Sequence, residues 1–554
     1  MKETLNRILE ESFKNNWDRP ALSDYKGKTL HYRDVARKIV KLHILFESSG
    51  IGKGEKVALC SRNQSNWGVV LLACLTYGAI PVPILHEFKA GNIEFIVNHS
   101  ESKCLFVSGL INDMITPSHM PDLKAIVNMD DLSLILSNDA AVNETIEHIN
   151  ELFGKKFPKS FSVGDVRFVA EQNPDDLAMI NYTSGTSGFS KGVMIPYRAL
   201  LANINFARKY LPELDNTKEV VSMLPSAHMY GMMFEFLYEM CIGCHVHFLT
   251  RTPSPSIIVK AFEEIKPAVI ISVPLIIEKI YKNKLQPFLQ KPGVRFMLSL
   301  PIVDKKIKEK INATLSDSFG GNFIQVIVGG APFNKEAEKF FHDIGFRFTV
   351  GYGMTECAPL ITYSPWNNRK LGSCGKVIDD VELKIDSSDP TTVPGEILVK
   401  GPVVMLGYYK NEEATKDAFT EDGWMRTGDL GILDAEGFLF IKGRCKSMIL
   451  GASGQNIYPE EIEGALNNMP YVAESLVIED NGRLVALVYP DMDSARDNGI
   501  EYDALQKKME ENIEIINTDL PNYSKIANVK LMPEEFEKTP KRSIKRYIYQ
   551  NTTI

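Results

Sequence analysis

Side chains suited to phosphate binding are concentrated in the segment 181–193, whose sequence is NYTSGTSGFSKGV. Apolar residues at 177–180 and 193–195 predict a short buried strand on each side. A glycine-rich loop between strands can bring backbone N–H groups and hydroxyls close to an anion. The pattern therefore favours a phosphate-binding loop over a polar surface hairpin, and its spacing differs from that of a Walker A loop. The candidate residues of this loop are Thr183, Ser184, Gly185, Thr186 and Lys191.

Four further motifs follow this loop in the chain. Residues 349–356 read TVGYGMTE, 424–429 read WMRTGD, 443–446 read GRCK and 536–546 read FEKTPKRSIKR. In this order they resemble the signatures of the adenylate-forming superfamily, which includes acyl-CoA synthetases, luciferases and peptide-synthetase adenylation domains. The first and last of them look most similar to the motifs of long- and medium-chain fatty acyl-CoA synthetases. The resemblance covers essentially the whole chain.

The resemblance implies a role for each side chain of the nucleotide site. Tyr352 would stack on adenine, Thr355 would contact phosphate and Glu356 would help to hold Mg²⁺, a cation that prefers carboxylate and phosphate oxygens. Asp429 would bind both ribose hydroxyls as a bidentate acceptor, and Arg444 would contact the nucleotide. The residues expected to ligate the metal or to act in catalysis at this site are Thr183, Lys191, Thr355 and Glu356.

A second group of candidates is expected to bind the acyl substrate. His228 follows a predicted strand at 219–224 and precedes an apolar helix, and taken alone it fits a buried core position equally well. A Pro-x-x-His or aromatic motif at this distance lines the acyl site in the superfamily, which favours the substrate role. The segment 325–332 is expected to be a strand that opens onto a Gly-Gly turn, where backbone can approach a ligand. A tight strand-to-helix turn has the same signature. The other candidates of this group are Gly329, Gly330, Ala331 and Gly351.

The resemblance also implies two domains. Residues 1–445 are expected to form an AMP-binding region with the ATP and acyl sites, and residues 446–554 a small mobile lid. Lys446 would be the hinge, and rotation about it would give the two active-site arrangements that two half-reactions need. Ser453 and Gly454 join Lys446 in the expected cofactor-binding set.

The last motif departs from the family at one position. Ser543 stands where fatty acyl-CoA synthetases carry a Lys that bridges the carboxylate and ATP. A Ser cannot supply the charge of that Lys. Side chains two apart share a face of an extended segment, so Lys541 and Lys545 are equally placed to substitute. We expect Lys541 to do so, because Lys545 has a counterpart of its own in relatives; Ser543 and Lys541 complete the catalytic candidates.

The alternation of helical and strand-like runs predicts an α/β fold. Over the first 110 residues it indicates layering around a parallel sheet. The segment 67–85 carries no charge and approaches the length of a membrane span, but a glycine and two prolines in its second half would break a helix there. We expect a buried helix to about Tyr77 and a buried strand around 79–84. Short alternating strands in 372–407 predict a small β-barrel beside two α/β layered subdomains and an α/β lid.

The composition and the cysteine content indicate the class of protein and the cellular compartment in which we expect it. The 554 residues are 44% hydrophobic and 24% charged, as in ordinary globular proteins, and the net charge of −8 argues against a nucleic-acid-binding protein. The N-terminal segment shows no secretion signal, and eight irregularly spaced cysteines suit a reducing compartment, so a cytoplasmic location is expected. The segment 241–245 matches the c-type haem spacing, and His247 adds a metal ligand type. Without an export signal we expect buried structural cysteines instead.

Together these inferences predict an AMP-forming acid–thiol ligase that uses ATP, Mg²⁺ and CoA. A medium- or long-chain fatty acid would attack the α-phosphate of ATP, and CoA would then take the acyl group from the acyl-adenylate. Acyl-carrier protein is an alternative acceptor, and a catalytically impaired acyl or nucleotide sensor is an alternative function. No nucleic-acid partner and no transmembrane segment are expected, whereas peripheral membrane contact is compatible with the sequence.

Overall fold

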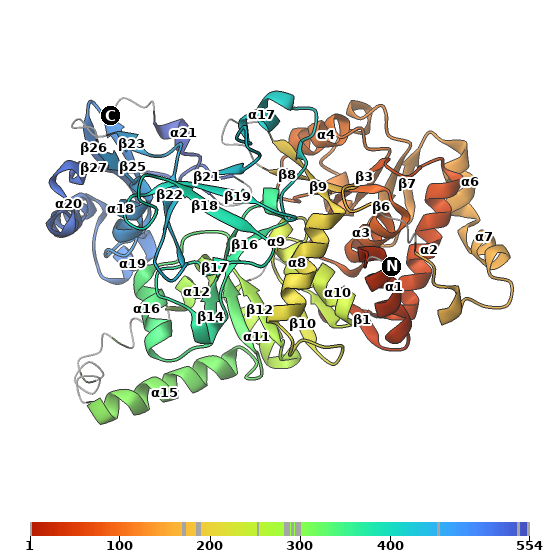
Figure 1. The fold of residues 1–554 in the computed structure, drawn as a ribbon, viewed down its shortest axis with the longest axis horizontal. Coiled ribbons are helices and arrows are strands. Elements are labelled where there is room, and N and C mark those ends of the chain that lie inside the picture. Colours follow the sequence, from red (N-terminus) through yellow and green to blue (C-terminus); the bar gives the residue numbers. More distant parts are fainter. Residues whose placement is uncertain are drawn as a thin grey trace.

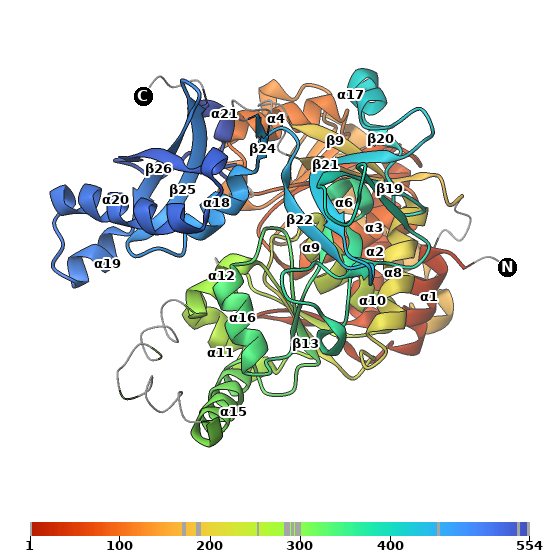
Figure 2. The ribbon, with the colours of Figure 1, turned by 60° about the vertical axis from the view of Figure 1, so that its left-hand side comes forward.

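The computed structural model describes residues 3–168, 173–183, 190–251, 254–281, 301–450, 455–539 and 543–550, together with residues 289 and 293. Helices and sheets alternate through the N-terminal region, and the C-terminal region forms a smaller body at its side (Figures 1 and 2). The predicted α/β class is confirmed. Among the described residues, no helix has both the length and the apolar character needed to cross a membrane.

The first sheet has the strand order β4-β3-β5-β6-β7. Its first four strands are parallel and β7 is antiparallel to β6. Helix α3 (Ser65–Tyr77) is buried on nearly all sides because most of its residues are apolar. It ends at Gly78, whose φ of 89° suits a glycine cap. The buried helix and strand predicted for 67–85 are therefore α3 and β4. The strands are β3 (Lys56–Cys60), β4 (Ile80–Ile84), β5 (Cys104–Val107), β6 (Ala125–Asn128) and β7 (Leu134–Ser137).

Helices alternate with the strands of this sheet along the chain, and the first described element is also a helix. The described residues of the segment 113–173 form β6, β7 and four short helices. The helices of this part are α1 (Leu5–Asn15), α2 (Tyr32–Ser48), α4 (Ala90–His99), α5 (Gly109–Asn112), η1 (Pro117–His119), α6 (Ala140–Glu147), α7 (Ile149–Lys156) and η2 (Val163–Asp165).

Two further sheets are largely parallel and are formed mainly by strands from the middle of the chain. One has the order β10-β11-β1-β2, with β2 antiparallel to β1, and the other has the order β12-β13-β14. Their strands are β1 (Pro20–Asp24), β2 (Thr29–His31), β10 (Glu219–Ser222), β11 (His245–Phe248), β12 (Val269–Ser272), β13 (Gln325–Val328) and β14 (Phe348–Val350). The helices between them are α8 (Tyr197–Tyr210), α9 (Met229–Met232), the π-helix η3 (Met233–Leu237), α10 (Tyr238–Ile242), α11 (Pro255–Ile265), α12 (Pro274–Ile280), α15 (Pro301–Ser318) and α16 (Lys335–Asp343).

Antiparallel sheets connect these layers to the C-terminal region. The expected small β-barrel corresponds to the sheet β18-β19-β21-β22, which is open in the described part of the chain because the ladder does not join β18 to β22. The strands of the antiparallel sheets are β8 (Leu177–Thr183), β9 (Lys191–Pro196), β15 (Tyr352–Gly353), β16 (Leu360–Tyr363), β17 (Lys376–Val377), β18 (Glu382–Asp386), β19 (Gly395–Lys400), β20 (Gly407–Tyr408), β21 (Met425–Leu433) and β22 (Leu439–Arg444). The short helices of this part are η5 (Thr355–Cys357), η6 (Trp366–Asn368) and α17 (Glu412–Asp417).

The C-terminal region has a hydrophobic core of its own, made by residues between Ile457 and Val529. Its main sheet is β25-β26-β27, against which α18 and α20 pack. The elements here are β23 (Ile449–Leu450), β24 (Asn456–Ile457), α18 (Pro459–Leu466), β25 (Val472–Asp480), β26 (Arg483–Pro490), α19 (Met492–Asp497), α20 (Tyr502–Asp519), η7 (Asn522–Ser524), β27 (Ile526–Leu531) and α21 (Arg546–Tyr549).

Candidate active site

The predicted phosphate loop lies between two strands of an antiparallel hairpin. β8 and β9 pair so that Thr183 lies opposite Lys191, and β20 pairs with β9 on its other side, which brings Tyr408 to the same sheet. A Cβ at Gly192 would lie 2.9 Å from the Ile180 side chain, so a glycine is needed there for the strands to pack. The loop candidates Ser184, Gly185 and Thr186 lie outside the described residues.

Tyr408 connects two of the predicted catalytic side chains. Nζ of Lys191 lies 4.8 Å from the centre of its ring, within the range of a cation–π contact. Its hydroxyl donates a hydrogen bond of 2.9 Å to Oε1 of Glu356. Burial and the neighbouring Glu356 carboxylate both raise the pKa of Tyr408, so the phenol keeps its proton and remains a donor. The sequence motifs did not single out Tyr408.

Glu356 lies on the short helix η5 and is only 9% exposed. Its backbone carbonyl accepts the N–H of Met405 at 2.9 Å, which fixes η5 against the segment before β20. A carboxylate has about four acceptor positions, of which Tyr408 uses one. Glu356 therefore has the capacity to ligate a hard cation as well, and the buried Thr355 begins the same helix.

Asp429 is held by two predicted nucleotide-binding residues. Its Oδ2 accepts a hydrogen bond of 2.7 Å from the Tyr352 hydroxyl, and its Oδ1 accepts one of 2.7 Å from Nε of Arg444. The antiparallel register of β21 and β22 places Asp429 directly opposite Arg444. Tyr352 was expected to stack on adenine, and the structure adds a second contact through its hydroxyl. Burial, followed by the Asp429 carboxylate, raises the pKa of Tyr352 well above its ordinary value.

The Arg444 guanidinium links the two groups of side chains electrostatically. The Asp429 carboxylate raises the pKa of Arg444, and Tyr352 and Glu356 add smaller contributions in the same direction. The Asp429 side chain is 6% exposed, whereas that of Arg444 is 53% exposed. The buried Asp429 carboxylate thus lies behind the Arg444 guanidinium, which a ligand can reach. Each oxygen of the Asp429 carboxylate keeps a lone pair for a further hydrogen bond.

The expected substrate-binding segments also meet. Nδ1 of His228 accepts the backbone N–H of Tyr230 at 3.3 Å, which caps α9. The Tyr230 hydroxyl donates to the carbonyl of Ile327 at 3.0 Å, and its ring lies beside Gly329, where a Cβ would be 3.3 Å from it. Gly330 has a φ of +88°, which glycine adopts without strain. The strand-to-turn geometry predicted for this segment is therefore present.

The two remaining substrate candidates are Ala331 and Gly351, which lie next to the Gly329–Gly330 turn and to β13. Ala331 is exposed directly after the Gly-Gly turn, and the N–H of Gly351 donates to the carbonyl of Val328 at 3.0 Å.

A buried carboxyl group that the sequence did not reveal supports the His228 segment. Glu235 lies on the π-helix η3 and is fully buried. Its Oε2 accepts the backbone N–H groups of Met223 and Leu224 at 3.1 Å and 3.0 Å. These bonds fix the chain immediately before Pro225–His228, and π-helical turns occur frequently at functional sites. Burial raises the pKa of Glu235 well above its ordinary value.

The C-terminal candidate Ser543 lies in a short antiparallel pairing. Lys538 and Ile544 form an antiparallel bridge, and the N–H of Thr539 donates to the carbonyl of Ser543 at 2.8 Å. The expectation that Lys541 and Lys545 are equally placed about Ser543 stays a prediction. Lys545 forms an ion pair of 3.2 Å with Glu537. The candidates Lys541, Ser453 and Gly454 lie outside the described residues, and Lys446 is exposed after β22.

Sequence profiles agree with this geometry. The profile of a family described as AMP-binding enzyme matches residues 9–409. The chain belongs to the family of AMP-binding enzymes. The resemblance predicted from the motifs is thereby confirmed, and the profile of the AMP-binding enzyme C-terminal domain matches residues 446–552.

Curated relatives of this AMP-binding enzyme include named fatty-acid ligases. The chain is 29% identical over 462 residues to a long-chain-fatty-acid–CoA ligase, FadD15, of Mycobacterium bovis, with 78% of this chain and 72% of the relative covered. It is also 29% identical over 496 residues to a long-chain-fatty-acid–CoA ligase of Escherichia coli O6:H1, with 85% and 82% covered.

Solved structures of low sequence identity share the fold of this AMP-binding enzyme. ATP-bound MatB from Rhodopseudomonas palustris is 21% identical with a TM-score of 0.76, over 99% of this chain and 98% of that one. The o-succinylbenzoate CoA synthetase MenE from Bacillus subtilis, solved with ATP and magnesium, is 21% identical with a TM-score of 0.74, over 98% of each chain. The large N-terminal region and the small C-terminal region are thus arranged as in known members of the fold.

Proposed function

We propose that this AMP-binding enzyme converts a fatty acid to its CoA thioester in two steps. The carboxylate oxygen of the acid attacks the α-phosphorus of ATP, and the bond to the β-phosphate oxygen breaks, releasing pyrophosphate. The thiolate sulfur of CoA then attacks the acyl carbonyl, and AMP leaves with the oxygen that linked it to the acyl group. The observation that carries the proposal is the single site formed by Lys191, Tyr408 and Glu356 beside Asp429 and Arg444.

The described residues suit a nucleotide in three respects. The buried Asp429 carboxylate can accept both ribose hydroxyls at the lone pairs that Tyr352 and Arg444 leave. The Lys191 cation is held beside Glu356 by the Tyr408 ring, where it can stabilise charge that develops on phosphate oxygens. Thr183 faces Lys191 across the hairpin that carries the phosphate loop.

The donor set also fits Mg²⁺. Glu356 provides a carboxylate and Thr183 a hydroxyl, and oxygen ligands of this kind are the ones that Mg²⁺ prefers. When bound, the ion would neutralise charge on the phosphate oxygens. The protein's own part is to keep the Glu356 carboxylate oriented through Tyr408 and through the Met405 N–H.

An apolar chain on the acid is supported by the curated relatives, which include long-chain-fatty-acid–CoA ligases that are 29% identical to this chain. Burial of each chain methylene contributes about 0.8 kcal/mol, which favours medium- or long-chain acids over short ones.

The lid completes the proposal. We infer that residues 446–554 rotate about Lys446 between the two half-reactions, and that the segment 538–546 approaches the ATP site during the first one. Ser543 lacks the cation that the family motif carries at this position, so Lys541 takes over its role. The cytoplasmic location inferred from the sequence stays a prediction.

Product analysis tests the function and its alternatives. The protein is incubated with ATP, Mg²⁺, CoA and linear acids from acetate to stearate, and the products are separated by liquid chromatography and mass spectrometry. We expect AMP, pyrophosphate and acyl-CoA, with the longer acids preferred. Acyl-adenylate that passes to holo acyl-carrier protein but not to CoA would identify a carrier-protein ligase. Binding of ATP and acid without any product would identify a sensor.

A further inference from the structure

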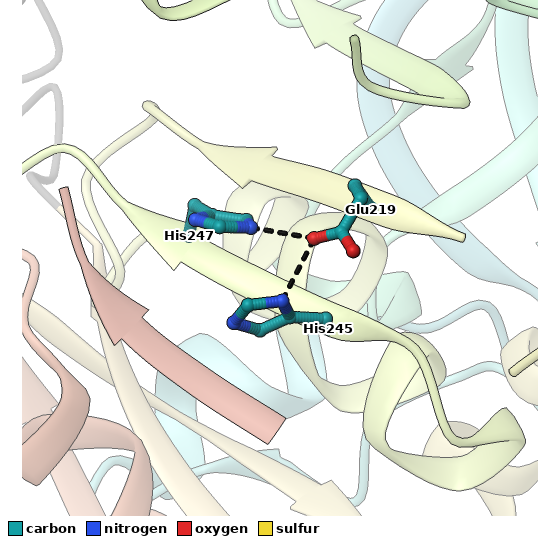
Figure 3. A group of neighbouring side chains, drawn as sticks. All are labelled: Glu219, His245 and His247. Carbon is teal, nitrogen blue, oxygen red and sulfur yellow. Dashed lines mark hydrogen bonds and ion pairs between the residues drawn. The ribbon is translucent and has the colours of Figure 1, made fainter. Parts of the chain in front are cut away.

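Three metal-ligand side chains converge on the sheet β10-β11-β1-β2, outside the residues assigned to the active site. Nδ1 of His245 lies 2.8 Å from Oε2 of Glu219, and Nε2 of His247 lies 2.6 Å from the same oxygen (Figure 3). The three donor atoms all lie within 4.8 Å of one another. Both imidazole rings therefore contact the same carboxylate oxygen of Glu219.

The convergence follows from strand register. β10 and β11 are parallel, and Glu219 at the start of β10 is paired with His245 at the start of β11. His247 lies two residues further along β11, and side chains two apart point to the same face of a strand. Hydrogen-bonded strands therefore hold all three side chains on one face.

The environment of the cluster suits a bound cation. The His245 and His247 side chains are 14% and 16% exposed, whereas the Glu219 side chain is 41% exposed, so an ion can enter past the carboxylate.

A second layer of polar groups orients one imidazole. Nε2 of His245 lies 2.7 Å from the Ser23 hydroxyl on β1, and that hydroxyl lies 2.7 Å from the Thr29 hydroxyl on β2. With Nδ1 bound to a metal, Nε2–H would donate to Ser23. Histidine ligands in metal sites commonly donate their other ring N–H to such a partner, which fixes the tautomer.

We propose that Glu219, His245 and His247 bind one zinc-type divalent metal ion. Two imidazoles and one carboxylate are a common zinc ligand set, with water in the fourth position. Tetrahedral zinc with bonds of about 2.0–2.1 Å separates its ligands by about 3.3 Å, so the present contacts need to open by roughly half an ångström. The ion displaces the protons that now link the imidazoles to Glu219.

The ion joins the starts of two adjacent strands and takes no part in acyl activation. The candidate substrate residue His228 follows the other end of β10. The neighbouring cysteines are not ligands: Cys241 and Cys244 are buried as predicted, and Sγ of Cys244 contacts the carbonyl of Asp215 at 3.2 Å.

Zinc binding to the full-length protein tests the proposal. The protein is stripped of metal with a chelator, which is then removed, and it is titrated with Zn²⁺ in a calorimeter without ATP. The number of bound metal ions per chain is measured by elemental mass spectrometry. We expect one zinc per chain that is lost, or bound about tenfold or more weakly, in Glu219→Gln and His247→Gln. Glu219→Gln keeps the size of the side chain, and circular dichroism checks the folding of both variants.

A matched control variant is His119→Gln, because His119 and Glu94 form a single imidazole–carboxylate contact of 2.8 Å outside the cluster. It should bind zinc like the unaltered protein, and so should Cys244→Ser. X-ray absorption at the zinc edge needs no variant and should give nitrogen and oxygen ligands, two of them imidazoles, without sulfur. The proposal is overturned if the unaltered protein binds no zinc, if sulfur is a ligand, or if both cluster variants retain the full affinity.

Discussion

The replacement of Asp429 by Asn changes the proposed ribose contact while the size of the side chain is kept. In the structure, Oδ1 accepts from Arg444 and Oδ2 from Tyr352, and each oxygen keeps one lone pair for a ribose hydroxyl. Asn has one acceptor oxygen and one NH₂ group. Whichever way the amide is turned, the NH₂ group faces a donor, either the N–H of Arg444 or the O–H of Tyr352. The variant therefore loses one ribose acceptor and the negative charge.

The magnitude follows from the hydrogen bond that is lost. A hydrogen bond to a charged group contributes about 1.5–3 kcal/mol, which corresponds to roughly 10- to 150-fold weaker ATP binding. We expect this loss in a calorimetric titration of Asp429→Asn with ATP. Asp434→Asn is a matched control, because Asp434 lies on the turn after β21 and is paired with Lys370 instead. Its affinity for ATP should be unchanged.

Deoxy analogues of ATP separate a lost contact from a damaged fold. The unaltered protein should bind ATP more tightly than either 2′-deoxy-ATP or 3′-deoxy-ATP, whereas Asp429→Asn should lose its discrimination against at least one of the two analogues. Thermal unfolding of the variant reports separately on the contacts of Tyr352 and Arg444 that the substitution weakens. Full discrimination against both analogues in Asp429→Asn would refute the ribose assignment.

Further predictions concern the metal ligand and the lid. Glu356→Ala should abolish acid-dependent exchange of pyrophosphate into ATP, whereas Tyr408→Phe should retain part of it; unchanged exchange in Glu356→Ala contradicts the metal assignment. Lys446→Pro should keep acyl-adenylate formation and impair thioester formation, and equal loss of both would exclude the hinge. Ser543→Lys should raise the adenylation rate about tenfold or more, or about 1.4 kcal/mol in barrier, and Lys541→Ala should lower it. Thioester formation from supplied acyl-adenylate should barely change in these two variants, and unaltered exchange in Ser543→Lys would disprove the role of position 543.

Local patterns predicted individual elements of the fold well. The helix α3 and the strand β4 divide the apolar segment 67–85 where its glycine and prolines require. These elements are specified by residues close in sequence. The strands β6 and β7 were not among the predicted elements, because they obtain their partners from β5 and from each other rather than from local periodicity.

The contacts within the site depend on distant residues and could not be predicted in the same way. Tyr408 reaches Glu356 across 52 positions because β20 pairs with β9. Tyr352 reaches Asp429 across 77 positions. Glu219 meets His245 through the register of two parallel strands, and parallel pairing has no short turn that would mark it in the sequence. The motifs therefore named side chains that the structure brings into contact, but they did not reveal the contacts themselves.

The fate of the carboxylate oxygens of the acid tests the central claim most directly. A fatty acid labelled with ¹⁸O in both carboxylate positions is converted with ATP and CoA, and the products are analysed by mass spectrometry. Attack on the α-phosphorus followed by thiol attack on the carbonyl leaves one ¹⁸O in AMP and none in pyrophosphate. The appearance of ¹⁸O in inorganic phosphate together with ADP, or unlabelled AMP beside labelled acyl-CoA in full turnover, would contradict the proposed mechanism.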